Sequence, residues 1–356
     1  MFSKNLKYYR LKKGMTKKEL AEQIQASSMS ITNYENGNRK PDMEVLKKMA
    51  EVLNVRIADF LTVRNDNIAF SHGEFRKSSS LIKAQQEYVR ESVEEYFQRF
   101  MTIVEILGGE VLPEPPQPEA LVLFGDAEKD GLALRQHLNL SEEGPIDDLI
   151  EILENKGILV YALDINNDNF FGMNGFVNER PYIVINQHMS PERSRSTIVH
   201  ELAHMMFQWP SSIDDKEEEY HSTAISGAFL FPKNDVIREL GIRRRLISKD
   251  MTLIAKEYGI SMYMLVKRAR LCGVISESVE KDFYFKASKA GWKKNEPIRI
   301  DREMPTLFQQ LVYRGVNEQE ISMQRGAELL KIPYDDIADR CCFSEDEMVN
   351  CYHLRD

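Results

Sequence analysis

The sequence predicts an α+β protein of several domains, with an all-α head, a small α+β core that contains a three-stranded sheet, and a helical C-terminal region. Three observations predict this class. Helical periodicity fills the first sixty residues, three short apolar runs follow one another between residues 158 and 186, and helical periodicity returns after Pro232. A chain of 356 residues is long enough to bury two or three separate cores.

Residues 1–62 predict a compact bundle of four short helices. The first ends at Gly14, and Thr16 caps the second with Glu19 as its capping-box partner. The third runs from Ser28 to Glu35. This segment holds 12 Lys and Arg against 7 Asp and Glu, although the whole chain carries a net charge of −9. A basic head on an acidic body indicates that only the head meets nucleic acid.

Two stretches of the head, Thr16-Lys17-Lys18-Glu19-Leu20-Ala21 and Ser30-Ile31-Thr32-Asn33-Tyr34-Glu35-Asn36-Gly37-Asn38-Arg39-Lys40-Pro41, resemble the XRE, or phage-repressor, helix-turn-helix family. The resemblance covers about sixty residues and implies that the third helix enters the major groove of DNA. By position it implies phosphate-backbone contacts from Lys17, Arg39 and Lys40, and base-edge contacts from Ser28, Met29, Thr32 and Asn33. Gln25 departs from the family, which usually turns on a glycine there. The alternative is a head that docks onto proteins.

Residues 63–118 predict a helical linker and a proline-rich hinge. An apolar stripe with helical spacing runs from Leu81 to Leu107, and Pro113-Glu114-Pro115-Pro116-Gln117-Pro118 then excludes helix. The stripe predicts packing against a neighbouring element or a second copy of the chain. A homodimer is therefore one arrangement that the sequence allows, and XRE domains generally read two half-sites.

Residues 119–235 predict the α+β core. Helices are expected over 119–138 and from Pro145 to Gly157, and strands over 158–163, 170–177 and 182–186, with a hairpin turn at 178–181. A helix around residues 197–207 follows. Helices, three strands and a last helix that contains His200, Glu201 and His204 resemble the layout of a small zincin core, in which an edge strand receives the peptide substrate. The sequence does not identify that strand.

The chemistry is carried by His200-Glu201-Leu202-Ala203-His204. Two histidines four residues apart lie on one face of a helix. Zincins use this spacing to hold Zn²⁺ with both imidazoles, while the glutamate takes a proton from the attacking water. The motif therefore predicts His200 and His204 as metal ligands and Glu201 as the catalytic base. The alternative is a core helix with two hydrogen-bonded histidines.

Four further stretches, Leu132-Ala133-Leu134-Arg135, Gly144-Pro145-Ile146-Asp147-Asp148-Leu149, Arg195 to His204, and Ala228-Phe229-Leu230-Phe231-Pro232, are similar to the ImmA/IrrE metallopeptidase family. Those enzymes cleave DNA-binding repressors or antitoxins. Their third ligand is a glutamate eleven residues before the proline that ends the helix, and this chain has His221 there. The resemblance thus implies a Zn²⁺ site of His200, His204 and His221. Alternatively Glu217 or Glu218 completes the site, or the change has left a non-catalytic domain.

Residues 236–356 predict a helical region. The stretch from Leu253 to Arg268 has the helix–Gly–Ser–helix rhythm of a second helix-turn-helix, and Lys267, Arg268 and Arg270 make its second helix basic. This helix could pack against the core or contact DNA. No chemistry can be assigned to residues 280–356.

The sequence thus predicts a DNA-binding zinc endopeptidase that cleaves a partner repressor or antitoxin to relieve gene silencing. The alternatives are a transcriptional regulator with a non-catalytic sensor domain and a toxin–antitoxin interaction partner. Four cysteines without a C-x-x-C pair favour a reducing cytoplasm. The absence of a signal-peptide core and of a long apolar run predicts no association with a membrane.

Overall fold

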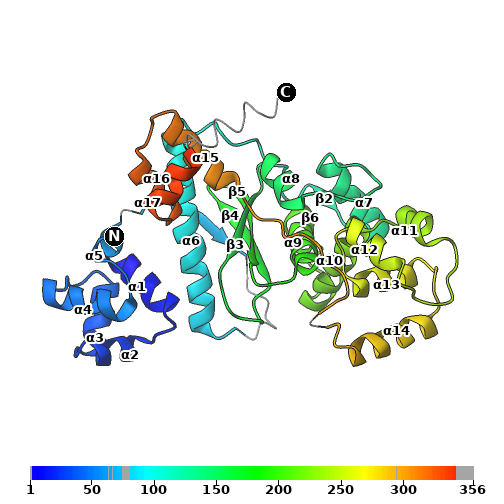
Figure 1. Cartoon of the computed structure of the whole chain (residues 1–356), viewed down its shortest axis with the longest axis horizontal. Coiled ribbons are helices and arrows are strands. Elements are labelled where there is room, and N and C mark those ends of the chain that lie inside the picture. The colour runs from blue at the N-terminus through cyan, green and yellow to red at the C-terminus, as the bar shows by residue number, and fades with distance from the viewer. Residues whose placement is uncertain (1, 63, 66, 74–80, 294, 342–356) are drawn as a thin grey trace, which may run out of the picture. The chain divides into compact units, whose positions relative to one another are not determined.

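The computed structural model of the chain describes residues 2–62, 64–65, 67–73, 81–293 and 295–341. Its described residues form two compact units. The first contains residues within 2–69, 81–111 and 308–341, and the second contains 70–73 and 112–307. Each unit is therefore assembled from segments far apart in the sequence, and we describe each by itself (Figure 1).

The head of the first unit consists of α1 (Phe2–Lys12), α2 (Lys17–Gln23), α3 (Ser28–Glu35), α4 (Met43–Leu53) and a short α5 (Ile57–Leu61) that the sequence did not predict. The capping box of Thr16 and Glu19 is confirmed. Gln25 adopts a φ of +59°. Its backbone thus occupies the left-handed region where the family usually places glycine, and the turn between α2 and α3 is kept.

A buried ion pair holds α1 against α3. The guanidinium of Arg10 donates to both carboxylate oxygens of Glu35, at 2.5 and 3.1 Å, and to the backbone oxygen of Met15 at 2.7 Å. Both side chains are almost completely buried. Removing one partner of such a pair leaves a buried charge without compensation, so the pair fixes the position of α3.

The rest of the first unit consists of the long helix α6 (Lys83–Ile106) and the C-terminal helices α15 (Leu307–Asn317), α16 (Met323–Leu330) and α17 (Tyr334–Cys341). The Phe308 ring packs 5.3 Å from those of Tyr96 and Phe100 on α6. The predicted grouping of 236–356 as one region is thus wrong, because the described residues 308–341 belong to the same compact unit as α6. The apolar stripe of α6 therefore packs, at least in part, against helices of the same chain.

The sheet of the second unit has four strands rather than the predicted three. Its order is β1 (Phe70–His72), β4 (Gly172–Val177), β5 (Arg180–Asn186) and β3 (Leu159–Leu163). β4 is antiparallel to both β1 and β5, and β3 is parallel to β5. The additional strand comes from the predicted helical linker, where its three residues carry no periodic signal. The predicted four-residue hairpin turn is shorter, because only Asn178 and Glu179 lie between β4 and β5, both with positive φ.

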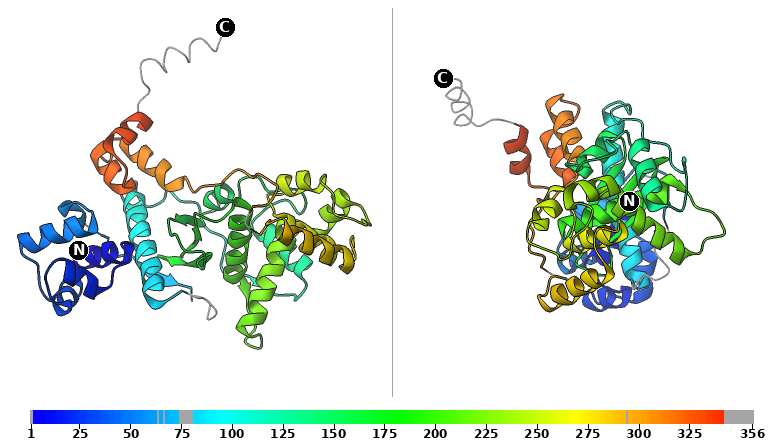
Figure 2. Two further views of the ribbon diagram at one scale, coloured as in Figure 1. Left: turned by 60° about the horizontal axis from the view of Figure 1, so that its bottom comes forward. Right: turned by 90° about the vertical axis from the view of Figure 1, so that its right-hand side faces the viewer.

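The described residues of the second unit also form eight helices, which extend from one side of the sheet (Figure 2). They are α7 (Ala127–His137), α8 (Leu149–Asn155), α9 (Pro191–Met206), α10 (Asp215–Leu230), α11 (Lys233–Leu240), α12 (Met251–Glu257), α13 (Met262–Leu271) and α14 (Glu277–Lys289). The predicted helix 119–138 begins only at α7, because Leu121–Val122 form β2, which pairs with β6 (Phe207–Gln208). The second predicted helix begins at Leu149 rather than at Pro145.

The predicted boundary at 235 is also wrong, because one hydrophobic core runs without interruption from α7 to α14. α12 and α13 are the two helices of the second predicted helix-turn-helix rhythm. Arg268 on α13 is 2% exposed, donates to the backbone oxygen of Phe231 at 2.9 Å and pairs with Glu128. Its role is therefore packing within the unit.

A buried carboxylate connects α8 to the segment before α15. Glu154 accepts the backbone N–H groups of Thr306 and Leu307, at 3.0 and 3.1 Å, and its burial raises its pKa to about 7. The folded unit therefore holds a proton there that the unfolded chain releases above an ordinary glutamate pKa. The free energy of unfolding of the unit consequently falls as pH rises from about 4.5 to about 7, because only the unfolded chain releases the Glu154 proton in this range. Above about pH 7 this contribution no longer changes with pH.

We therefore expect Glu154→Gln to reduce the loss of stability between pH 5 and pH 8 by on the order of 2–3 kcal/mol. Both tryptophans, Trp209 and Trp292, lie in the second unit, so their fluorescence during urea unfolding reports on this unit. Glu257→Gln, an exposed glutamate on α12, is the matched control. An equal pH dependence in wild type and Glu154→Gln would contradict the assignment.

Candidate metal centre

The second unit brings two histidines and a glutamate to one point. His200 and His204 lie on α9, and Glu219 lies on α10. The two Nε2 atoms are 3.0 Å apart. Glu219 reaches both, with Oε2 at 3.4 Å from Nε2 of His200 and Oε1 at 3.6 Å from Nε2 of His204. Among the described residues, these three are the one group of His, Cys, Asp or Glu whose ligand atoms lie close enough to hold a metal ion.

The spacing of these atoms fits zinc. Zinc bound at about 2.0–2.1 Å in tetrahedral geometry places neighbouring ligand atoms about 3.3 Å apart. The three separations, 3.0, 3.4 and 3.6 Å, bracket that value. Two nitrogens and one carboxylate form the ligand set of zincins that keep a fourth position open for water and substrate. The donors therefore fit Zn²⁺ in both chemistry and distance.

The other ring nitrogen of each histidine has its own partner. Nδ1 of His204 lies 2.7 Å from a carboxylate oxygen of Glu218, and Nδ1 of His200 lies 3.3 Å from Oγ1 of Thr223. A partner at Nδ1 fixes the orientation of the imidazole and directs Nε2 to the metal position. Both partners come from α10, so one helix supplies the third ligand and the groups that orient the first two.

Glu201 lies beside the three donors, between α9 and the sheet. Its side chain is buried, and its Oε2 accepts a hydrogen bond of 2.8 Å from the amide Nδ2 of Asn174 on β4. Gly172 on the same strand lets β4 approach α9, since a Cβ there would lie 2.7 Å from Cγ2 of Thr197. The carboxylate is thus held from the sheet side, on the same helix as His200 and His204.

His221, the predicted third ligand, does not join this group. Two residues along a helix rotate the side chain by about 200°, so His221 and Glu219 point to opposite sides of α10. His221 is half-buried, and its ring lies 5.8 Å from that of Tyr220. The alternatives Glu217 and Glu218 are not at the third position either, because Glu217 is exposed and Glu218 bonds to the far nitrogen of His204.

No sequence signal selects Glu219 over its neighbours. The buried residues of α10 lie at helical spacings from both candidates: Ser222 and Ser226 follow Glu219 by three and seven residues, and Ile225 and Ala228 follow His221 by four and seven. The prediction of His221 followed the family's distance to Pro232. The packing of α10 on α9 brings Glu219 to the two histidines instead.

The predicted DNA contacts gather on α3 and the turn after it. Ser28 and Met29 on α3 are exposed, and Thr32 and Asn33 are half-buried. Arg39 and Lys40 after α3 are exposed. Lys17 at the start of α2 pairs with Glu35 at 3.5 Å, so its charge is partly compensated within the head.

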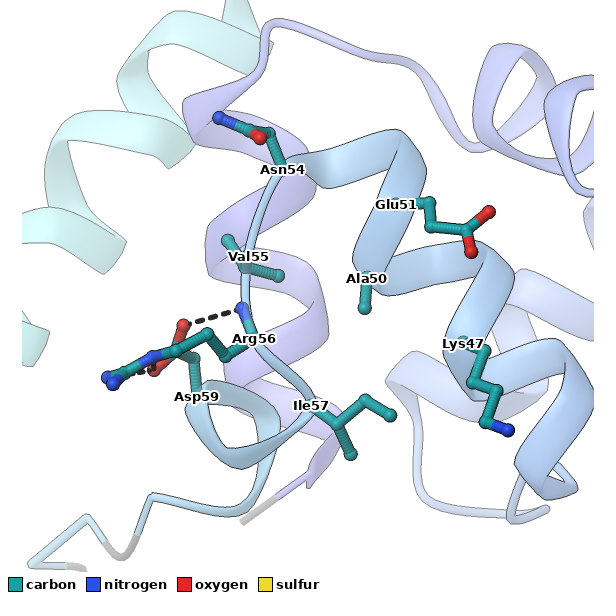
Figure 3. A pocket seen from close by; sticks show the side chains of 8 residues that line it. All are labelled: Lys47, Ala50, Glu51, Asn54, Val55, Arg56, Ile57 and Asp59. Atoms are coloured by element: carbon teal, nitrogen blue, oxygen red, sulfur yellow. Dashed lines mark hydrogen bonds and ion pairs between the residues drawn. The ribbon is translucent and has the colours of Figure 1, made fainter.

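A shallow depression on α4 and α5 of the head offers no comparable chemistry (Figure 3). It is lined by Lys47, Ala50, Glu51, Asn54, Val55, Arg56, Ile57 and Asp59. Within it, the carboxylate of Asp59 accepts hydrogen bonds from the backbone N–H of Arg56 at 2.8 Å and from its guanidinium at 2.9 Å. These groups compensate each other.

Comparison with known families places both parts of the chain. Residues 6–60 match the family model described as helix-turn-helix, and residues 153–270 match the one described as IrrE N-terminal-like domain. The second match contains His200, Glu201, His204 and Glu219. In the part of the chain that the structure describes, no helix combines the length and apolar character that crossing a bilayer requires.

Two relatives from Bacillus subtilis each align with about a fifth of the chain. The chain is 32% identical over 77 residues to a protein of Bacillus subtilis named uncharacterized HTH-type transcriptional regulator YqaE, and 36% identical over 63 residues to HTH-type transcriptional regulator ImmR of the same organism. These alignments span 22% and 18% of this chain and 66% and 49% of the relatives. The chain therefore covers less than two thirds of either relative.

Two further proteins are similar to the chain. A putative multi-protein-binding factor 1 of Yarrowia lipolytica is 40% identical over 48 residues, which are 14% of this chain and 32% of that protein. A crystal structure of Bacillus thuringiensis PlcR with the peptide PapR7 and DNA aligns with 95% of this chain and 90% of its own, at 13% identity and a TM-score of 0.17. A score that low carries no argument.

The roles of Glu219 and His221, two residues apart on α10, can be distinguished by experiment. We expect Glu219→Ala to weaken zinc binding at least about 100-fold, because it removes a ligand, whereas His221→Ala should keep about one zinc per chain. Zinc content of the purified full chain by mass spectrometry, followed by competition with a chelator, measures both. Loss of zinc in His221→Ala and its retention in Glu219→Ala would show that the ligand assignment is wrong.

Proposed function

Because this chain joins an XRE-type helix-turn-helix domain to an ImmA/IrrE-type peptidase domain, we propose that it is a DNA-binding zinc endopeptidase that cleaves a partner repressor or antitoxin and so relieves gene silencing. The observation that carries the proposal is the convergence of both Nε2 atoms and the Glu219 carboxylate next to Glu201. Two imidazoles and a carboxylate make it a gluzincin-type site.

The residues around the centre have separate roles in hydrolysis. Zinc bound there would polarise the scissile carbonyl and lower the pKa of a water molecule. Glu201 would accept a proton from the attacking water and deliver it to the leaving amine. Asn174 holds Glu201 through the 2.8 Å hydrogen bond to one of its two carboxylate oxygens. Glu218 and Thr223 keep the two imidazoles in the orientation that aims Nε2 at the metal position.

The second candidate function is a transcriptional regulator whose peptidase-like domain senses but does not cut. It is favoured by the names of two relatives, which are HTH-type transcriptional regulators. Both candidates require the head to bind DNA, and only the first requires Glu201. Either role suits the cytoplasm, where DNA and repressors are found.

We expect Glu201→Gln to reduce proteolysis by roughly 10²–10⁴-fold while DNA binding and zinc content stay unchanged, because only the proton acceptor is lost. Sequencing of new protein N-termini, in cells that express wild type or variant, detects cleavage of any cellular protein and so identifies the substrate as well. Glu217→Gln, an exposed neutralisation on α10, is the matched control. If the same cuts persist in Glu201→Gln, or if wild type produces none, the endopeptidase proposal fails.

The exposed cations Arg39 and Lys40 after α3 allow a test of DNA binding by the head. We expect Arg39→Ala with Lys40→Ala to weaken binding to all DNA sequences alike and to lower the salt dependence of binding by about two counterions, because both residues are assigned to phosphates. Fluorescence anisotropy at several salt concentrations measures this. Lys47→Ala, an exposed cation on α4, serves as the control, and an equal effect of Lys47→Ala would contradict the assignment.

A further inference from the structure

We propose that the outer edge of β4 is the peptide-binding edge of the metal centre, and that strand β1 of the same chain occupies it as a built-in competitor. This inference rests on the proposed peptidase function and adds its regulation. The partner is a peptide in extended conformation that runs antiparallel to β4. Such a peptide can pair with β4 only after β1 has left.

Two contacts place β4 directly beside the centre. Asn174 on this strand holds Glu201, and Gly172 lies against both Glu201 and Thr197 of α9. β4 pairs with β5 on its inner side, so its remaining row of backbone donors and acceptors faces outward. An extended peptide binds a sheet edge by adding a strand to it. A peptide added to β4 would pass the carboxylate that takes the proton in hydrolysis.

In this structure β1 holds that row of donors and acceptors. Its register pairs Phe70 with Val177, Ser71 with Phe176 and His72 with Gly175. The backbone N–H of Gly73 donates to the oxygen of Asn174 at 2.9 Å. The chain thus runs from the far end of β4 toward Asn174, the residue that holds Glu201. This is the direction and the strand that an added peptide would use.

Side chains and a glycine adapt the edge to β1. Nδ1 of His72 lies 2.6 Å from the hydroxyl of Tyr182 on β5, and the His72 ring stacks on Phe70 at 5.6 Å. Gly175 permits the close approach, because a Cβ there would lie 2.5 Å from the Ser71 oxygen and closer still to the Tyr182 hydroxyl. β1 is only three residues long, so few hydrogen bonds would have to break for it to be displaced.

Removing a single backbone N–H donor of β1 would weaken its pairing with β4. Antiparallel pairs that exchange both hydrogen bonds alternate with pairs that exchange none. The bond from Gly73 to Asn174 marks one bonded pair, so Ser71 and Phe176 form the next. Ser71→Pro removes the donor of that pair, whereas Ser71→Ala keeps it. The Ser71 side chain is exposed and lies outside the metal centre, so the two variants differ chiefly in one backbone donor.

A second, less disruptive variant controls for the possibility that Ser71→Pro misfolds. His72→Leu removes the hydrogen bond to Tyr182 and leaves every backbone donor of β1 in place. We expect its effect to have the same direction as that of Ser71→Pro and to be smaller. Agreement between the two variants separates release of β1 from general damage to the unit.

The test measures access to the edge with a defined probe. The probe is a fluorescein-labelled peptide with the sequence of residues 67–75, and the protein is the full chain carrying Glu201→Gln so that the peptide is not consumed. We expect the peptide to bind at least tenfold more tightly with Ser71→Pro than with wild type or Ser71→Ala. Hydrogen exchange at the Phe176 amide should rise in Ser71→Pro and fall again when peptide is added.

Equal peptide affinity in all variants, or increased exchange at Phe176 without peptide binding, overturns the inference and leaves β1 as a structural strand. Neither readout requires hydrolysis, so failure of the proposed function is distinguishable. If peptide binding follows the expected order but no variant with an intact Glu201 cleaves protein, the edge is a regulated docking site without a peptidase. If wild type cleaves and Ser71→Pro cleaves no faster, the peptidase stands and its built-in competitor does not.

Discussion

The close packing of α9 on α10 is the constraint on which the functional site depends. Two histidines four residues apart on one helix supply only two ligands and no fixed ring orientation. α10 supplies Glu219, together with the partners of both Nδ1 atoms, Glu218 and Thr223. The small residue Ser226 allows the helices to approach, and its hydroxyl donates to the backbone oxygen of Ser196 at 2.9 Å. Any change that separates these helices would disturb ligand and orienting groups together.

Buried arginines connect the loops around this helix pair. Arg135 donates to the backbone oxygens of Phe229, Ser141 and Gly144, and Arg195 donates to those of Ile146 and Asp147. These contacts join the separate stretches on which the ImmA/IrrE resemblance rested. A planar guanidinium can donate to several carbonyl oxygens at once, so each arginine joins backbone oxygens from different segments. The sequence showed the stretches, and the structure shows why they occur together.

Local chemistry was predictable from the sequence, and long-range pairing was not. The capping box at Thr16 and Glu19, the limits of α3 and the placement of His200, Glu201 and His204 on one helix all depend on spacing within a few residues. β1 escaped prediction because a three-residue strand has no periodicity, and its partner β4 lies about a hundred residues away. Glu219 was not predicted, because only the packing of α10 on α9 places its carboxylate beside His200 and His204.

Zinc K-edge X-ray absorption of the wild-type protein tests the central claim most directly. Imidazole rings give multiple-scattering features that carboxylates lack, so the spectrum counts histidine ligands. A centre of His200, His204 and Glu219 predicts two imidazoles and oxygen ligands at about 2.0–2.2 Å. Three imidazoles, or a protein that holds no stoichiometric zinc, would contradict the account.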